Sequence, residues 1–370
     1  MSIYYADTLA DGKTTYYLIR LEADGSILPL QTKYLKHKMN ERCSSNTVQR
    51  IAYTIAFYMN FLAEQELSIE DVVKMSYADQ QKHFTDFLYW IKTGNHSDRL
   101  KCPSNNTCNS YLQTVFGFYE FLYLEYEQFG ELKVLEDSDI TYRSSAGIRF
   151  RKNVKSFKGY FPKEEHKGRT ISRDKIEILL DACTNIRDKL LIILLAESGF
   201  RIGELLGIRY TEDIDYENHT LYVRYRDDNS NGVYAKNAEY RRAKVSDSTF
   251  ELLELYIAEN AQELQKTDYL FITLYGDTKG KPLTKKAVYS LLNTLKKKTG
   301  VEATPHMLRH YFANERRKAG WDITLISKAL GHKHIATTEC YLNIENDELE
   351  AATDKYYAGT KDLMNISKVI

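Results

Sequence analysis

Two fragments of the sequence combine arginine and histidine in a way that suits the binding of a phosphate group. In "ESGFRIGELLGI", Arg201 follows an apolar stretch and a glycine, and in "TPHMLRHYFAN", Arg309 follows His306 at a spacing of three. The guanidinium group is planar and permanently charged, and its fork matches two phosphate oxygens at a time. Histidine can hydrogen-bond the same group or transfer protons near neutral pH. These residue types favour phosphate chemistry.

Each fragment also has a purely structural interpretation. Arg201 stands among residues that we expect to be buried, and a buried arginine usually has a partner or a ligand. Glu204, three residues further on, can be that partner and can hold the orientation of the guanidinium group. His306 and His310 are equally explained as packed residues of one helix. Taken alone, neither fragment decides between structure and function.

A metal site is the third interpretation of the histidines. His306 and His310 form an HxxxH pair, and His332 and His334 could add two more ligands. A zinc hydrolase of this type needs a glutamate directly after the first histidine, where it acts as a base. Met307 stands at that position. We therefore expect no metal ion in the site.

Taken together, the fragments resemble a known family. "SGFRIGELLGI", "TPHMLRHYFAN" and "LGHKHIATTECY" are similar to three motifs of the tyrosine recombinases, the integrase family of phages and mobile elements. They occur in the order of that family, and Tyr341 follows His332 at the family's spacing of nine. The resemblance covers roughly residues 170 to 345. The chain has 29 tyrosines, and this spacing singles out Tyr341 among them.

The resemblance implies a mechanism. Tyr341 would attack a DNA phosphodiester, form a 3′-phosphotyrosyl bond and release a 5′-hydroxyl group. Arg201 and Arg309 would bind the non-bridging oxygens as negative charge develops on the phosphorus. His306 would handle the proton of the tyrosine, and His332 would hydrogen-bond the phosphate. The phosphodiester energy is conserved in the covalent bond, so neither ATP, a metal nor another cofactor is implied.

The family also uses a lysine, which protonates the leaving 5′ oxygen. The matching position is Lys236 in "YAKNAEYRRAKV", ahead of a turn between two expected strands. The surroundings depart from the family pattern, since the usual Gly-Lys-Gly and Val-Pro neighbours are missing and the preceding loop "RDDNSNG" is long. Lys244 is the alternative. Either lysine could instead be an ordinary surface residue of a strand.

The apolar periodicity predicts the elements that must position these residues. Helical spacing dominates residues 35–130 and 170–208, further helices are expected at roughly 247–263, 284–298, 305–319 and 322–330, and short β-rich runs lie at 219–225, 232–236 and 240–246. A first hairpin is expected at 15–30 around an Asp24-Gly25 turn. The predicted fold is mainly α with a small antiparallel β-sheet (α+β). The expected divisions are a hairpin arm (1–34), a helical core-site DNA-binding domain (35–140), a basic linker (141–168), a catalytic domain (169–345) and a tail (346–370).

Charge is unevenly distributed although the net charge is formally zero. The segment 141–168 has eight lysines and arginines against two acids, whereas 345–354 has five acids and no base. The basic segment is either a solvated connector or a strap across DNA phosphates. For the strap, the candidate DNA-binding residues are Arg149, Arg151, Lys152, Lys155 and Lys158.

Composition excludes several other classes of protein. The chain has 370 residues, which favours two domains, and it is 43% hydrophobic and 28% charged, as in ordinary globular proteins. No apolar run is long enough to span a membrane, and the N-terminus lacks the pattern of a secretory signal. Five scattered cysteines without a CxxC pair favour reduced thiols. We expect the protein in the cytoplasm of a prokaryote, associated with the nucleoid.

The partners implied by the resemblance are double-stranded DNA with inverted-repeat core sites and three further copies of the chain, as a homo-tetramer on DNA. Accessory proteins are also expected, and recombination would pass through a Holliday junction. Two alternatives share the fold. A type IB topoisomerase-like nicking-closing enzyme would use the same chemistry as a monomer, and a non-catalytic DNA-binding regulator would retain the fold alone.

Overall fold

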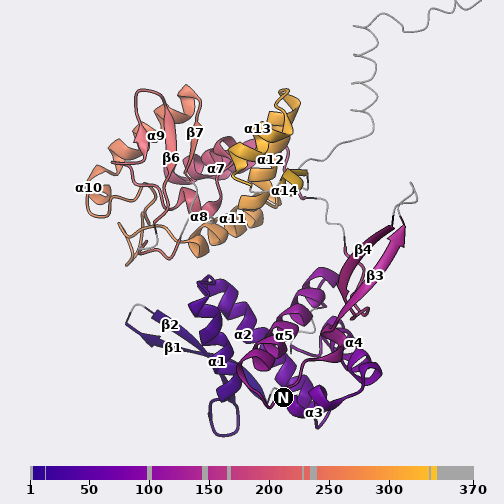
Figure 1. Cartoon of the computed structure of the whole chain (residues 1–370). Helices are drawn as coiled ribbons and strands as arrows, with labels where there is room; N and C mark the ends of the chain where they lie inside the picture. The colour runs from indigo at the N-terminus through magenta and orange to yellow at the C-terminus, as the bar shows by residue number, and fades with distance from the viewer. Residues whose placement is uncertain are drawn as a thin grey trace, which may run out of the picture. The chain divides into compact units, whose positions relative to one another are not determined.

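The computed structural model describes residues 3–12, 14–97, 102–143, 149–164, 168–226, 229–233, 240–332 and 335–339. The chain divides into two compact units, residues 1–165 and 166–370 (Figure 1). Each unit has its own hydrophobic core. Within the described residues, no helix is long and apolar enough to cross a membrane.

The first unit is a helical bundle with two β-hairpins. Its elements are β1 (Tyr4–Asp11), β2 (Thr14–Leu21), α1 (Pro29–Asn40), α2 (Ser45–Glu64), α3 (Ile69–Lys74), α4 (Tyr77–Lys92), α5 (Asn105–Glu125), a 3-10 turn η1 (Lys133–Leu135), β3 (Asp137–Arg143) and β4 (Arg149–Lys155). Serine side chains cap the N-termini of α2, α3, α4 and α5, which satisfies amide groups that a helix leaves free.

The hairpin predicted at 15–30 forms only in part, and a longer hairpin precedes it. The two paired strands are β1 and β2, which run antiparallel from Tyr4 opposite Leu21 to Asp11 opposite Thr14. The Asp24-Gly25 turn does form, because the Gly25 amide donates to the Leu21 carbonyl at 2.9 Å. The expected second strand is present as a short pairing, in which Ile27 lies opposite Arg20 and the Leu28 amide donates to the Ile19 carbonyl at 2.9 Å. It ends there because α1 begins at Pro29, a residue well suited to the first position of a helix.

An aromatic core holds the first unit together, and it also satisfies its own polar groups. The Tyr58 hydroxyl lies 2.8 Å from the Tyr119 hydroxyl and 3.0 Å from His83 Nε2, and all three side chains are buried. Burial lowers the pKa of His83 to about 4, so its imidazole is neutral at physiological pH. Phe84 packs edge-on against both Tyr119 and Phe116.

The basic segment expected as a linker, residues 141–168, contains β4 and the end of β3, which together form the second hairpin. β3 and β4 pair antiparallel, with Asp137 opposite Lys155 and Arg143 opposite Arg149. Four of the five candidate DNA-binding residues are on β4, namely Arg149, Arg151, Lys152 and Lys155. The fifth, Lys158, is exposed three residues beyond the strand. No regular periodicity in the sequence indicated these strands.

The second unit surrounds a three-stranded antiparallel sheet, in the order β5-β6-β7, with helices. Its elements are α6 (Arg173–Ala182), α7 (Ile186–Ser198), α8 (Ile202–Leu205), β5 (Ile214–Asp215), β6 (Thr220–Val223), β7 (Arg241–Lys244), α9 (Asp247–Glu259), α10 (Ala261–Leu264), α11 (Lys285–Thr299), α12 (Pro305–Lys318), α13 (Ile323–Leu330) and α14 (Ile335–Glu339). The predicted class, mainly α with a small antiparallel sheet, is confirmed. The strand expected at 232–236 does not form at residues 232 and 233, and the rest of it lies outside the described residues.

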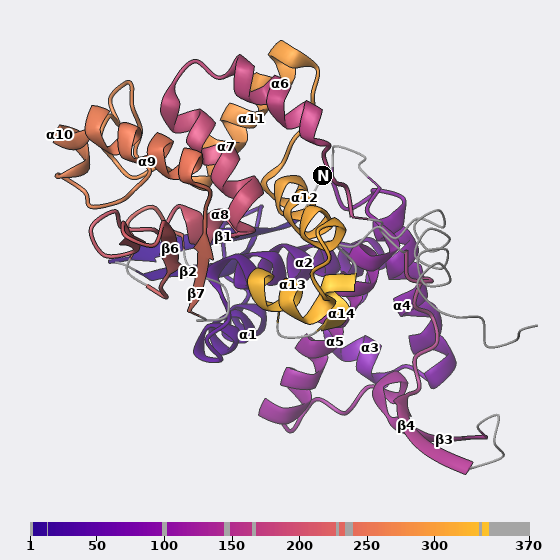
Figure 2. The same cartoon turned by 90° about the horizontal axis from the view of Figure 1, so that it is seen from above.

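A close approach between α7 and α12 sets the geometry of the second unit (Figure 2). The apolar α7 ends at Gly199, whose φ of +65° belongs to the left-handed region. A Cβ atom at this position would lie 2.6 Å from the ring of Phe312 on α12. The positive φ and the close contact with Phe312 both require glycine at residue 199. Arg201 follows two residues later.

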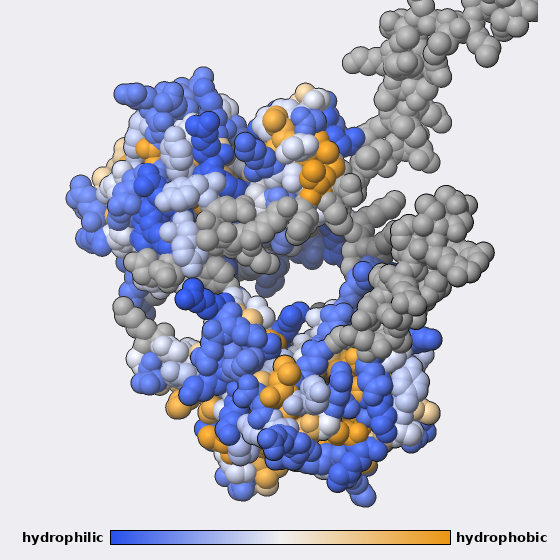
Figure 3. Space-filling view, viewed as in Figure 1, coloured by the Kyte–Doolittle hydropathy of each residue, from blue (hydrophilic) through white to orange (hydrophobic). Residues whose placement is uncertain are grey.

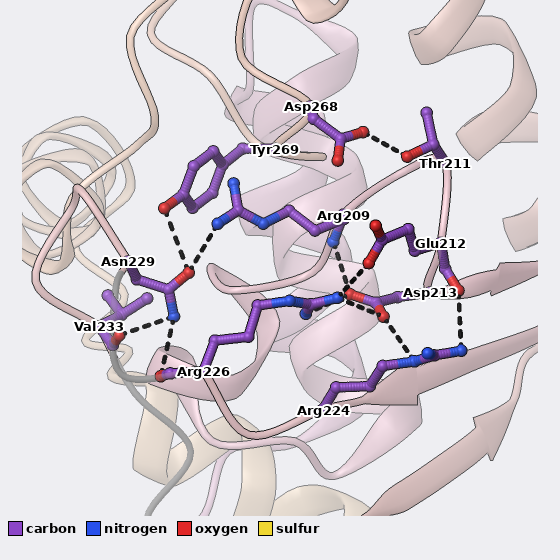
Figure 4. A network of polar contacts seen from close by, with 10 residues as sticks. All are labelled: Arg209, Thr211, Glu212, Asp213, Arg224, Arg226, Asn229, Val233, Asp268 and Tyr269. Atoms are coloured by element: carbon purple, nitrogen blue, oxygen red, sulfur yellow. Dashed lines mark hydrogen bonds and ion pairs between the residues drawn. The ribbon is translucent and has the colours of Figure 1, made fainter.

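A buried carboxylate secures the sheet to the preceding chain. Asp213 has no exposed surface, and it accepts hydrogen bonds from Arg226 Nη1 at 2.7 Å and from the Arg209 amide at 2.8 Å (Figure 4). The Arg209 guanidinium stacks over the ring of Tyr269 at 3.4 Å and donates to Asn229 Oδ1 at 3.0 Å. Such pairing is what makes a buried charge tolerable.

The core of the first unit predicts the outcome of two matched substitutions on α5. Leu122 is fully buried and Leu124 is 79% exposed. Leu122→Ala should lower the free energy of unfolding by about 2–5 kcal/mol, because it removes buried methyl groups and leaves a cavity. Leu124→Ala should change it by less than about 0.5 kcal/mol. Urea denaturation of the full chain measures both, and equal losses in the two variants would contradict this packing.

Candidate active site

Three arginines from distant segments meet at the C-terminal end of α13. Arg241 Nη1 donates to the Ala329 carbonyl at 2.9 Å, Arg309 Nη2 to the Leu330 carbonyl at 2.6 Å, and Arg201 Nη2 to the Gly331 carbonyl at 3.2 Å. The last carbonyls of a helix have no partner within the helix, and they carry the negative end of its dipole. Cations are therefore favoured at this end of α13.

Arg309 is the most deeply buried of the three, at 1% exposure. Its Nη1 donates to the Gly199 carbonyl at 2.6 Å, while its Nη2 binds the end of α13. The side chain projects from α12 and joins the ends of α7 and α13. Sequence reasoning predicted Arg309 as a phosphate ligand, and the structure additionally gives it this structural role.

Arg201 and Glu204 form the ion pair that the sequence indicated. The Glu204 carboxylate is buried, and it accepts from the Arg201 amide at 2.7 Å and from Arg201 Nη1 at 2.9 Å. The Arg201 side chain remains 23% exposed. Glu204 thus holds the guanidinium from the protein side, and the exposed part of Arg201 is accessible to a ligand.

His332 lies beside Arg309, directly after α13. Its Nε2 is 3.0 Å from Arg309 Nη2, and its Nδ1 is 2.9 Å from the hydroxyl of Thr338. A guanidinium can only donate, so Nε2 accepts and the proton of the neutral ring is on Nδ1, which donates to Thr338. Burial, followed by the charges of Arg309, Arg201 and Arg241, lowers the pKa of His332 to about 3.

Arg241 was not predicted as a site residue. It begins β7, is 9% exposed, and forms an ion pair through Nη2 with the second oxygen of Glu204. The sequence "YRRAKV" offers two adjacent arginines in a strand, and alternation implies that one of them faces inward. This alternation could have indicated a buried arginine in the strand, although it does not identify which of the two is buried.

The structure does not place the remaining predicted residues in the arginine cluster. His306 is in the first turn of α12 and exposed, and the alternative lysine, Lys244, is exposed on β7. Lys236 and Tyr341 lie outside the described residues. His310 is buried on α12 against Gly168. Among the residues that the structure describes, no group of three or more histidine, cysteine, aspartate or glutamate side chains could hold a metal ion.

A pocket of about 440 Å³ opens next to the arginines. Arg241, Lys328, Gly331 and His332 line it together with Tyr240, Thr324, Ser327 and Ile335. Figure 3 shows apolar side chains in the region of α13, and Ile335 is 46% exposed. The site therefore has the features of an anion-binding pocket with an apolar rim.

The fold and this cluster define a helical domain that can bind phosphate through arginine. Comparison with known proteins agrees with this class. The sequence model of the phage integrase family matches residues 169–348. The tyrosine recombinase XerA of Saccharolobus solfataricus is 34% identical over 221 residues, which cover 59% of this chain and 68% of the relative. The chain belongs to the phage integrase family of tyrosine recombinases, and it is a DNA breaking and rejoining enzyme.

Other comparisons extend over nearly the whole chain. Transposase A from transposon Tn554 of Staphylococcus aureus is 28% identical over 355 residues, covering 92% of this chain and 94% of the relative. Among solved structures, the integrase of the Tn1549 transposon in complex with transposon right end DNA has a TM-score of 0.59 at 16% identity, covering 89% of this chain and 98% of that chain. XerH recombinase bound to a palindromic difH substrate has a TM-score of 0.58 at 17% identity, covering 88% of each chain. These two structures share the fold with this chain.

The environment of His332 predicts its titration in the DNA-free protein. The ordinary pKa of 6.5 falls to about 3 in the folded chain, so the imidazole should stay neutral at pH 5. Between these two values the unfolded chain binds more protons at this residue. Its contribution to stability is therefore complete above about pH 6.5 and is lost as the pH falls toward 3. NMR of histidine-labelled protein, with His332→Gln for assignment, measures the midpoint, and a value near 6.5 would refute this environment.

Proposed function

We propose that the chain is a site-specific recombinase of a mobile element, in which the arginine cluster binds the scissile DNA phosphate and Tyr341 attacks it. The observation that carries this proposal is the convergence of Arg201, Arg309 and His332 at the end of α13. These residues come from the three fragments that resemble the family's motifs. Tyr341 follows His332 by nine residues along the chain.

The two predicted arginines stabilise the transition state by electrostatics. Negative charge grows on the non-bridging oxygens as the phosphorus becomes five-coordinate, and fixed guanidinium groups in a partly buried site interact with it strongly. Arg201 and Arg309 are already held by Glu204, Gly199 and the end of α13, so they need little reorganisation. Positioning of this kind supports catalysis without a metal ion or ATP.

The covalent step exchanges one ester bond for another. The Tyr341 oxygen forms a bond to phosphorus while the bond from phosphorus to the 5′ oxygen breaks, giving a 3′-phosphotyrosyl bond. His306 accepts the phenol proton, and Lys236, or alternatively Lys244, protonates the leaving 5′ oxygen. Attack by a 5′-hydroxyl group reverses the step and releases the tyrosine. Exchange of the first pair of strands between two duplexes forms a Holliday junction, and exchange of the second pair resolves it.

His332 changes its hydrogen bonds when the phosphate arrives. In the free protein its Nε2 accepts from Arg309, so this nitrogen has no proton to offer a phosphate oxygen. The Thr338 hydroxyl can either accept from Nδ1 or donate to it. When a phosphate oxygen replaces His332 Nε2 as the acceptor for Arg309 Nη2, Thr338 donates to Nδ1, and the proton of the ring moves to Nε2, which then binds the phosphate.

The relatives support double-stranded DNA as the substrate and a mobile element as the setting, since they include a transposase and a transposon integrase. Recognition of inverted-repeat core sites by a homo-tetramer, with accessory proteins, is the arrangement we propose. The basic residues of β4 together with Lys158 then bind the DNA backbone. A relaxation assay on supercoiled DNA without a site separates this proposal from a nicking-closing enzyme.

The covalent intermediate can be trapped directly. With a nicked suicide duplex from the ends of the element, the wild-type chain should form a protein–DNA adduct that survives denaturing electrophoresis. Tyr341→Phe should form none, because it lacks the attacking oxygen. Tyr275→Phe, at a tyrosine that is 70% exposed on the second unit, is the matched control and should react like the wild type. An adduct in Tyr341→Phe would assign the nucleophile to another residue.

Metal independence has its own test. Addition of EDTA to the same cleavage reaction should leave the adduct yield unchanged, because the proposed mechanism neutralises the phosphate with arginines alone. The measurement is the fraction of substrate in the adduct, with and without chelator and after readdition of Mg²⁺. Loss of the adduct with EDTA and recovery with Mg²⁺ would contradict the mechanism.

A further inference from the structure

Arg241 occupies a central place in the arginine cluster. Its two terminal nitrogens make different contacts, one to the Ala329 carbonyl at 2.9 Å and the other to the Glu204 carboxylate. Its guanidinium also lies 5.3 Å from the ring of Phe200. A single side chain from β7 thereby connects the end of α13 with the segment that carries Arg201.

Glu204 is held from two sides as a result. One carboxylate oxygen accepts from Arg201 Nη1 at 2.9 Å, and the other pairs with Arg241. The oxygen that pairs with Arg241 also accepts from the Arg201 amide at 2.7 Å, so both arginines together fix the plane of the carboxylate. Because Arg241 occupies Oε2, Arg201 binds the other oxygen of Glu204 through Nη1, and its Nη2 donates to the Gly331 carbonyl at 3.2 Å.

The chain that leads to His332 is shaped around Arg241. Gly331 ends α13 with a φ of +62°, in the left-handed region. A Cβ atom at this position would lie 2.5 Å from Arg241 Cδ. The Arg241 side chain therefore packs against Gly331, the residue before His332. Residues 329–332 together contact all three arginines.

The charge of the cluster is suited to an anion. Burial, followed by the charges of Arg309 and Arg201, lowers the pKa of Arg241 to about 8. Burial is the larger cause, and repulsion among the guanidinium groups is the smaller one; a negatively charged ligand relieves that repulsion. A phosphodiester in the neighbouring pocket has the appropriate charge.

We propose that Arg241 is a third member of the phosphate-binding cluster, a positioning residue that fixes Glu204 and the end of α13 so that Arg201 and His332 are aimed at the scissile phosphate. The proposal rests on the function proposed above and adds a residue to it. Arg241 does not perform a chemical step. Its effect should therefore appear in the rate of strand cleavage more than in the affinity for DNA.

Single-turnover cleavage of the suicide duplex tests this role. Arg241→Gln should lower the rate of adduct formation by about a hundredfold, as expected when a catalytic group is displaced by about 1 Å. The dissociation constant for uncleaved duplex should change by less than about threefold, because most of that affinity comes from other phosphate contacts. Arg241→Lys keeps the charge but cannot bind Glu204 and Ala329 together, so its rate should be intermediate.

A matched control separates positioning from simple loss of a buried ion pair. Arg187 pairs with the buried Asp188 at 2.6 Å and donates to the Ile272 carbonyl at 3.2 Å. It lies at the opposite end of the 13-residue α7, about 20 Å from Gly199 along the helix. Arg187→Gln should lower the unfolding temperature as Arg241→Gln does, and it should leave the cleavage rate within about twofold of wild type.

A double-mutant cycle identifies the route of the effect. If Arg241 acts through Glu204, then Arg241→Gln should lower the rate much less in a Glu204→Gln background than in the wild type. Cleavage at the wild-type rate by Arg241→Gln, or additive effects in the cycle, would overturn the proposal. If Arg241→Gln does not fold, the rate of Arg241→Lys decides, and a wild-type rate there would overturn it as well. Failure of the wild type itself to form an adduct would instead contradict the proposed function.

Discussion

Three guanidinium groups bind three consecutive carbonyls at the end of α13, and the architecture of the second unit depends on this contact. The arginines come from the chain after α7, from β7 and from α12, so their side chains close the unit where its helices end. The carbonyls have no partner within α13, and the guanidinium groups satisfy them. One interaction thereby secures the fold and concentrates positive charge at a single place.

The same contact explains how the site is prepared for catalysis. Buried like charges repel one another, and a folded chain keeps them together only where enough partners hold them. Here Glu204, the Gly199 carbonyl and the end of α13 supply those partners. A phosphate that enters the cluster finds its ligands already oriented, and His332 emerges from α13 in direct contact with Arg309. Stability and phosphate binding consequently depend on the same side chains.

Sequence reasoning identified the parts of this site that follow from local patterns. The break at Gly199, the Arg201–Glu204 pair and the helix that carries Arg309 all have short-range signals, and the structure contains each of them. Arg241 could not be chosen in this way, because its partners are separated from it by 37 and 88 residues along the chain. The hairpin of β3 and β4 was missed for another reason, because its two neighbouring strands show no apolar alternation in the sequence.

The central claim is that the arginine fork at residue 201, held in place by Glu204, stabilises the transition state of strand cleavage. The most direct measurement is the single-turnover rate of adduct formation by Arg201→Lys, with Arg187→Lys as a matched control at the other end of α7. An ammonium group retains the charge and loses the fork, so the account predicts a rate lower by about 10²–10³-fold in Arg201→Lys and an unchanged rate in the control. A wild-type rate in Arg201→Lys would contradict the account.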